Sequence, residues 1–192
     1  MNNMWSLPES LNIGGSDFQI RTDYRVILDI LWYFDNPDFE DDEKFEICKR
    51  ILYPKWRDIP QECNAEAIQK AVWFIDGGVD PTENSRSRTS LKLMDWEQDA
   101  QMIIPAINKV SGIEIRAVKY MHWWTFLSHY MEIGESLYTT VIGIRQKKAK
   151  GKKLDKSEEA FCRENKNLVD LKIKYSKEEL AEQARLKAIL DS

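Results

Sequence analysis

Apolar residues at helical spacing recur along most of this chain, and this pattern limits the fold to a mainly α-helical class. Residues 23–34, DYRVILDILWYF, show the pattern most clearly, and Thr22 can cap the helix that they predict. The apolar residues on its predicted inner face are Val26, Ile27, Ile30, Leu31 and Phe34. A second helix is predicted to follow the acidic residues 35–46 and to end near Leu52, since acidic side chains favour a helix N-terminus.

Six further helical patterns follow along the chain. They are predicted at 65–76, 95–110, 115–133 and 135–146, with two more inside residues 154–192. Asn64 can cap the first of them and Gly77-Gly78 can stop it, while the polar residues 77–92 indicate a flexible connection. The helix at 135–146 is expected to break at the lysine-rich residues 147–153.

One short element is expected to be β rather than α. Residues 11–20, LNIGGSDFQI, place two half-apolar runs on either side of Gly14-Gly15-Ser16, and glycine supplies the positive φ that a tight turn needs. The fold class predicted from the sequence is therefore a helical bundle of about six to eight helices with a short N-terminal β-hairpin.

The domain organisation follows from length and charge. A chain of 192 residues suits one domain with an appendage. We expect a helical domain over residues 1–146 and a charged helical appendage over residues 147–192, because the second part is highly charged and poor in aromatic residues. Within the appendage, Ser176 and Glu179 have the spacing of a capping box.

Composition excludes several classes of protein. The net charge of −4 gives no general electrostatic reason to expect a nucleic-acid partner. The three cysteines are far apart and lack metal-ligand or redox spacing, which indicates free thiols in a reducing compartment. No stretch of about eighteen apolar residues predicts a membrane span, and the first residues do not resemble a signal peptide. We expect a cytoplasmic protein.

Residues 119–130, KYMHWWTFLSHY, contain both histidines of the chain and raise the possibility of a chemical site. On a helix, His122 and His129 would lie about 10 Å apart along the axis, too far to share one metal ion. No cysteine, serine motif or glycine-rich loop beside them predicts a nucleophile or a phosphate site. The sequence therefore predicts no enzyme, no metal and no cofactor.

The same segment is unusually aromatic, and its rings have two possible roles. A helix that is apolar around so much of its circumference is either a central core helix or one whose outer face a partner covers. Central packing is the interpretation that we favour, but aromatic side chains are also enriched among interface hot spots. The candidate partner-binding aromatics are Trp123, Trp124, Phe126 and Tyr130.

Five lysines close together form the strongest basic feature of the sequence. They are Lys147, Lys148, Lys150, Lys152 and Lys153. They could bind nucleic acid or an acidic protein, or they could simply favour the negative end of a helix. The acidic residues 35–46 could also attract this run, within one chain or between two self-associating copies.

The order of several short motifs resembles a known family. SLPESLNIGGSDFQIRTDYRVILDI, DWEQDAQMIIPAINKVSGIEI, MHWWTFLSHY and LYTTVIGIRQKK follow one another as in the bacteriophage Gp-fifteen family of siphophages and prophages of Gram-positive bacteria, over about residues 5–150. The resemblance implies a tail assembly chaperone that binds the tape-measure protein and tail-tube subunits. It carries over no catalytic residues.

These observations lead to one leading hypothesis and one alternative. The leading hypothesis is a non-enzymatic tail-morphogenesis protein whose helical client lies along an apolar groove, with the aromatic helix and the charged flanks as contacts. The alternative is a nucleic-acid-associated phage protein that uses Lys147–Lys153.

Overall fold

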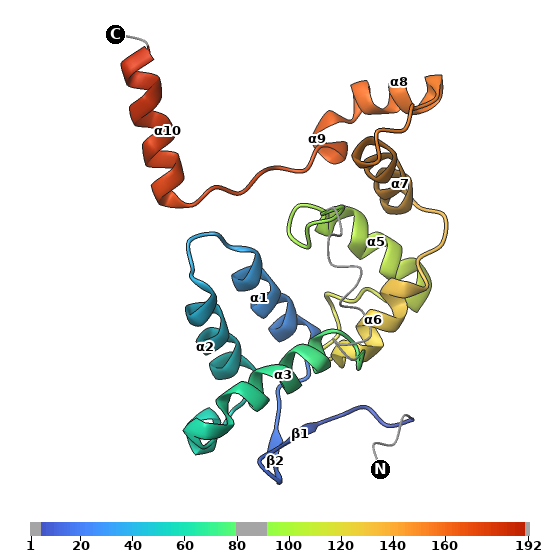
Figure 1. Ribbon diagram of the computed structural model, residues 1–192. Coiled ribbons are helices and arrows are strands. Elements are labelled where there is room, and N and C mark those ends of the chain that lie inside the picture. The colour runs from blue at the N-terminus through green and yellow to red at the C-terminus, as the bar shows by residue number, and fades with distance from the viewer. Residues whose placement is uncertain (1–4, 80–91, 191–192) are drawn as a thin grey trace.

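A computed structural model of the chain describes residues 5–79 and 92–190. Within these residues the fold is mainly helical, with eight helices of at least seven residues and one two-stranded antiparallel hairpin, which confirms the predicted fold class (Figure 1). The long helices are α1 (Tyr24–Asp35), α2 (Asp41–Leu52), α3 (Asn64–Ile75), α5 (Ala100–Ser111), α6 (Trp123–Met131), α7 (Leu137–Ala149), α8 (Lys156–Glu164) and α10 (Lys177–Leu190). Shorter turns are η1 (Trp56–Asp58), η2 (Gln61–Cys63) and α9 (Lys166–Val169). No helix in the described ranges is long and apolar enough to cross a membrane.

The hairpin forms at the predicted place. Strand β1 (Ser10–Ile13) pairs with β2 (Ser16–Gln19), so that Ile13 lies opposite Ser16 and only two residues make the turn. Gly14 and Gly15 both have positive φ, at 57° and 80°, as a two-residue turn of this kind requires. The backbone N–H of Gly14 also donates to the Glu66 carboxylate at 2.9 Å, which ties the turn to α3.

Helices α1 and α2 form an antiparallel pair, and α3 crosses below them (Figure 1). The inner face of α1 buries Ile27 and Ile30 completely, in agreement with the predicted apolar stripe. The third helix ends where its glycines predict, because Gly77 and Gly78 both have positive φ. A Cβ on Gly78 would lie 2.9 Å from the Trp124 ring, so this glycine also permits close packing of α6. Residues 80–91 of the predicted connection lie outside the described residues.

Two predicted helix caps are wrong by one residue. Asp23, rather than Thr22, caps α1 and accepts from the N–H of Arg25 at 3.0 Å, while the Thr22 hydroxyl bonds to that of Tyr120. Similarly, Asn64 is the first residue of α3, and its side-chain oxygen accepts from Lys49 at 3.1 Å. In both cases a residue distant in sequence engages the expected capping side chain.

The predicted helix at 115–133 is wrong in its first half, because the structure has a helix only from Trp123. Residues 115–121 run past the start of α1, and backbone oxygens of this segment accept hydrogen bonds from side chains of α1. Tyr24 donates its hydroxyl to the Ile115 oxygen, and Arg25 donates to the oxygens of Ile115 and Val118. An isolated antiparallel bridge between Asp23 and His122 completes this junction between the start of α1 and the start of α6.

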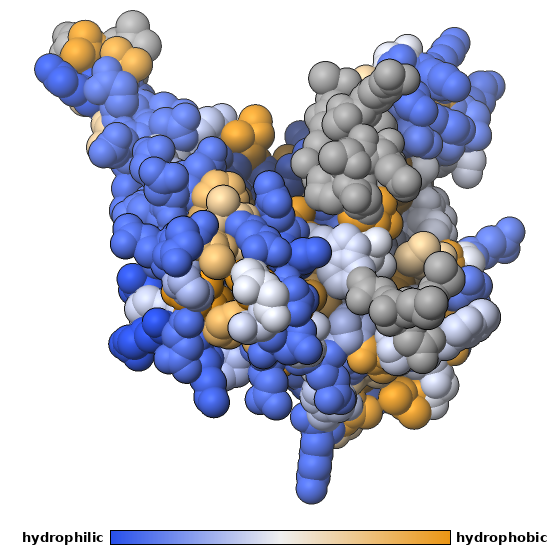
Figure 2. Space-filling view, turned by 60° about the horizontal axis from the view of Figure 1, so that its bottom comes forward, coloured by the Kyte–Doolittle hydropathy of each residue, from blue (hydrophilic) through white to orange (hydrophobic). Residues whose placement is uncertain are grey.

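The C-terminal part differs from expectation at one boundary. Helix α7 runs through Lys147 and Lys148 to Ala149. The predicted end of this helix at residue 146, before the lysine run, is therefore wrong by three residues. The capping box before α10 is present as predicted, with reciprocal bonds between Ser176 and Glu179. Helix α10 projects away from the other helices, and its described side chains are exposed and mostly hydrophilic (Figures 1 and 2). The predicted domain boundary at residue 146 stays a prediction.

The three cysteines should differ sharply in reactivity. Cys48 is fully buried in α2, and this burial raises the pKa of its thiol to about 12, whereas Cys63 and Cys162 are partly exposed. Because the thiolate is the reactive form, we expect iodoacetamide at about pH 8 to modify Cys63 and Cys162 and to leave Cys48 unmodified in the folded protein. Peptide mass spectrometry measures this, and urea-unfolded protein is the control. Equal modification of all three thiols without urea would contradict the packing of α2.

Candidate functional site

The aromatic residues of α6 divide between the core and the edge of the core. Trp123 and Phe126 are 1% and 2% exposed, and their rings stack with centroids 5.5 Å apart. Trp124 and Tyr130 are partly buried: Trp124 donates its indole N–H to the Phe74 oxygen at 2.9 Å, and the Tyr130 hydroxyl bonds to that of Tyr138. The fold therefore gives Trp123 and Phe126 a packing role and does not present them to a partner. Partner binding by Trp124 and Tyr130 stays a prediction.

Both histidines belong to α6: His122 is its N-cap and His129 lies within it. His122 caps α6: its Nδ1 accepts from the N–H of Trp124 at 3.0 Å, so Nε2 is left to donate to the Pro8 oxygen at 3.1 Å. His129 lies further along α6 and is partly exposed. Within residues 5–79 and 92–190, no three His, Cys, Asp or Glu side chains lie close enough to hold a metal ion.

The lysine run is partly neutralised by acidic side chains of the same chain. Lys147 pairs with Glu158 of α8 at 2.5 Å, and Lys148 pairs with Asp170 at 2.8 Å. The remaining lysines, Lys150, Lys152 and Lys153, are exposed at the end of α7. The structure does not bring them near the α6 aromatics, and two of the five charges are already paired, which weakens the electrostatic basis for nucleic-acid binding.

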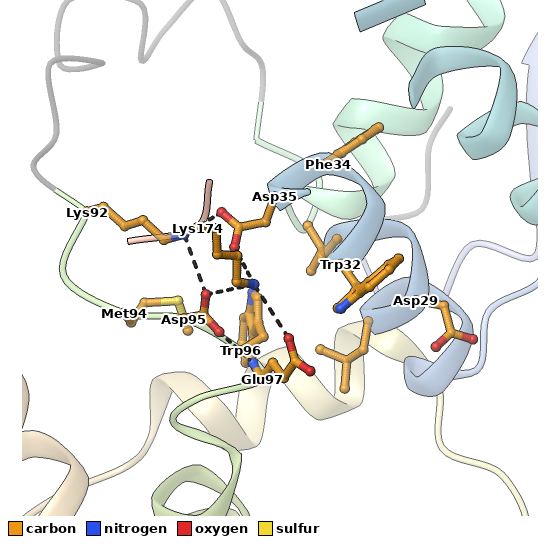
Figure 3. A pocket seen from close by; sticks show the side chains of 12 residues that line it. Asp29, Trp32, Phe34, Asp35, Lys92, Met94, Asp95, Trp96, Glu97 and Lys174 are labelled. Carbon is orange, nitrogen blue, oxygen red and sulfur yellow. Dashed lines mark hydrogen bonds and ion pairs between the residues drawn. The ribbon is translucent and has the colours of Figure 1, made fainter. Parts of the chain in front are cut away.

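A different place in the fold has the character of a binding site. A groove of about 510 Å³ runs between α1 and residues 92–97 (Figure 3). Its lining is largely apolar, and its apolar side chains are Leu28, Leu31, Trp32, Phe34, Met94 and Trp96. Apolar grooves with a few charged groups at the edge are the usual form of a site for a peptide or a helix.

Trp32 stands on the ridge beside this groove and is 42% exposed. A second hollow of about 590 Å³, lined by Arg21, Arg50 and neighbouring residues of α1 and α2, lies on its other side. Trp32 and Asp29 line both hollows. An exposed tryptophan between two hollows is a typical interface anchor.

The aromatic helix supports the groove from behind. Trp96 lines the groove and also packs against α6, with ring centroids 4.9 Å from Tyr130, 6.1 Å from Phe126 and 6.2 Å from Trp123. The aromatic helix α6 therefore holds Trp96 in place in the groove wall. The buried rings of α6 do not themselves line the groove.

The wall that carries Met94 and Trp96 is a turn, held by two aspartates. The Asp95 carboxylate accepts from the N–H groups of Glu97 and Gln98 at 3.0 and 2.9 Å, and the N–H of Asp95 donates to Asp99 at 3.0 Å. These contacts explain why α5 begins at Ala100 and not at the predicted Asp95. Asp99 is fully buried and pairs with both terminal nitrogens of Arg145, at 2.6 and 2.8 Å.

Charged side chains occupy the edge of the groove (Figure 3). Lys174, from the segment before α10, contacts Asp35 at 2.8 Å, Asp95 at 3.0 Å and Glu97 at 3.5 Å. Lys92 also pairs with Asp35 and lies 3.5 Å from Asp95. Burial opposes the charge of Asp95, but the bond from Gln98 and the pairing with Lys174 outweigh it, so the pKa of Asp95 lies well below its usual range.

The sequence predicted an apolar groove with the aromatic helix and the charged flanks as contacts and did not predict this groove at α1, although one signal pointed to it. Trp32 does not belong to the apolar stripe of its own helix, and a large aromatic residue on the outer face of an amphipathic helix indicates an interface. Trp96 and Lys174 gave no such signal, because their roles depend on contacts with distant elements.

A family model described as Bacteriophage Gp15 protein matches residues 4–171. The chain belongs to the bacteriophage Gp15 family. No curated protein matches this chain, and no solved structure matches it. In this Gp15-family chain, the groove walls on α1 and at residues 92–97 fall inside the matched range. Lys174 and α10 lie beyond it.

Proposed function

We propose that this Gp15-family chain is a tail assembly chaperone that binds a helical segment of the phage tape-measure protein. In this role it would keep the tape-measure protein soluble and bring tail-tube subunits to it, in the cytoplasm of the bacterial host. It would do so by binding alone, without catalysing a reaction.

The observation that carries the proposal is the apolar groove with Trp32 at its ridge. The groove offers three large aromatic side chains and three aliphatic or thioether side chains on one side of the fold. A client helix with large apolar residues at positions i, i+3/i+4 and i+7 would present a stripe of the matching kind. Long helical proteins that are not yet assembled expose such stripes, and covering them prevents aggregation.

Replacing Trp32 by alanine tests the groove directly. We expect a weaker complex with the tape-measure protein, by about 2 kcal/mol or roughly thirtyfold in Kd, because an exposed central tryptophan is a typical hot spot. The stability of the chaperone should change little, since Trp32 is 42% exposed. Co-expression followed by co-purification and by the yield of soluble tape-measure protein measures the effect.

The matched control is Met131→Ala on α6. Met131 is 79% exposed and lies outside the groove lining, so this variant should bind as the natural chain does. If the natural chain neither retains the tape-measure protein nor raises its soluble yield, the proposed function is wrong. If Trp32→Ala and Met131→Ala bind equally well, the client binds elsewhere.

A further inference from the structure

The edge of the groove carries more negative than positive charge. Its acidic lining residues are Asp29, Asp35, Asp95 and Glu97, and its basic ones are Lys92 and Lys174. Lys174 is the only one of these that comes from beyond residue 97, and it meets three of the carboxylates within 3.5 Å. A cation from the C-terminal tail of this chain, residues 171–190, therefore sits at the most acidic corner of an otherwise apolar groove.

The tail reaches this corner through few contacts. Residues 171–176 form neither helix nor strand. The Gln98 side chain holds the backbone on either side of Leu171, by donating to the Asp170 oxygen at 2.8 Å and accepting from the N–H of Lys172 at 2.9 Å. Further on, the N–H of Lys177 donates to Asp38 at 2.7 Å.

The apolar side chains of the tail do not fill the groove. Ile173 is 72% exposed and Tyr175 is 40% exposed, on either side of Lys174. The tail therefore satisfies the charge of the acidic corner and leaves the apolar lining open. Removing it would leave Asp95, whose side chain is 4% exposed, without its closest cation.

We infer that the corner formed by Asp35, Asp95 and Glu97 is the recognition site for a lysine or arginine of the client segment, and that Lys174 occupies this site until the client displaces the tail. This inference rests on the proposed function and specifies its partner. The client segment carries a basic side chain next to the large apolar side chains that enter the groove. Charge complementarity then sets where the client lies along the groove.

The first test removes the charge of the competing lysine. Lys174→Gln in the full chain should bind the tape-measure protein roughly three- to tenfold more tightly, because less of the protein has an occupied site. Asp35→Asn combined with Glu97→Gln should bind it at least threefold more weakly, and raising the salt concentration should reduce the difference from the natural chain. Glu159→Gln on the exposed face of α8 is the matched control and should change nothing.

The second test follows the tail itself. Amide hydrogen exchange at Lys172 and Lys177 should become faster when the tape-measure protein binds, because displacement breaks both of their hydrogen bonds. Slower or unchanged exchange would overturn the inference. So would equal affinity of the natural chain, Lys174→Gln and the Asp35→Asn/Glu97→Gln variant, combined with loss of binding in Trp32→Ala. In that case the groove binds the client without using the corner. Absence of binding by the natural chain would instead remove the proposed function.

Discussion

Replacing Asp99 by alanine is expected to destabilise the fold by about 3–5 kcal/mol, the usual effect of removing one partner from a buried ion pair. Asp99 is fully buried, and Arg145 is 5% exposed. The Arg145 guanidinium also donates to the backbone oxygens of Leu93, Leu168 and Val169 at 2.6–2.9 Å. Without the carboxylate, a buried positive charge would remain with neutral partners only. Urea unfolding followed by circular dichroism measures the change.

An exposed ion pair provides the control for this prediction. Arg116 pairs with Glu114 at 2.7 Å, but both side chains are exposed, so Arg116→Ala should destabilise the fold far less than Asp99→Ala. The double replacement Asp99→Leu/Arg145→Met should recover part of the loss, since apolar residues can replace a buried pair. Equal effects of Asp99→Ala and Arg116→Ala would contradict the described burial.

Replacing Trp123 by alanine is expected to cost a similar amount, about 3–5 kcal/mol, because it opens a large cavity in the core. Trp123 is 1% exposed, stacks on Phe126 and donates its indole N–H to the Ile75 oxygen at 2.9 Å. It also packs against Trp96, so the groove should lose its shape together with the stability. Chemical unfolding measures the first effect, and binding of the tape-measure protein measures the second.

The conservative variant Trp123→Phe separates the ring from its hydrogen bond. It retains much of the aromatic volume but leaves the Ile75 oxygen without its indole donor, for which we expect a loss of about 1–3 kcal/mol. Met131→Ala, at a 79% exposed position of the same helix, should stay within about 0.5 kcal/mol. If Trp123→Ala were as mild as Met131→Ala, the core position of α6 would be wrong.

Much of the fold could be predicted because the deciding signals are local. Gly14 and Gly15 define a two-residue turn by themselves, and Ser176 and Glu179 define a helix start by themselves. The inner stripe of α1 likewise follows from spacing along one segment. In each case the residues that determine the structure are close to one another in sequence.

Several of the errors occur where contacts between residues distant in sequence determine the structure. Nothing within residues 115–121 shows that Tyr24 and Arg25 will bind the backbone oxygens a helix would need. The groove was missed for the same reason: Trp96 is positioned by α6, and Lys174 reaches Asp95 across a separation that no local pattern reveals. The aromatic segment was recognised as important, but only the structure separates its packing role from the groove next to it.

The junction at Asp23 and His122 has a consequence for synthesis on the ribosome. Tyr24 stacks on Phe126 with ring centroids 4.7 Å apart, and the N–H of Trp123 donates to the Thr22 oxygen at 2.7 Å. The first three helices therefore emerge with one apolar side uncovered, and they remain so until α6 has been synthesised. Until α6 has been synthesised, the nascent chain therefore exposes apolar surface that is prone to aggregation.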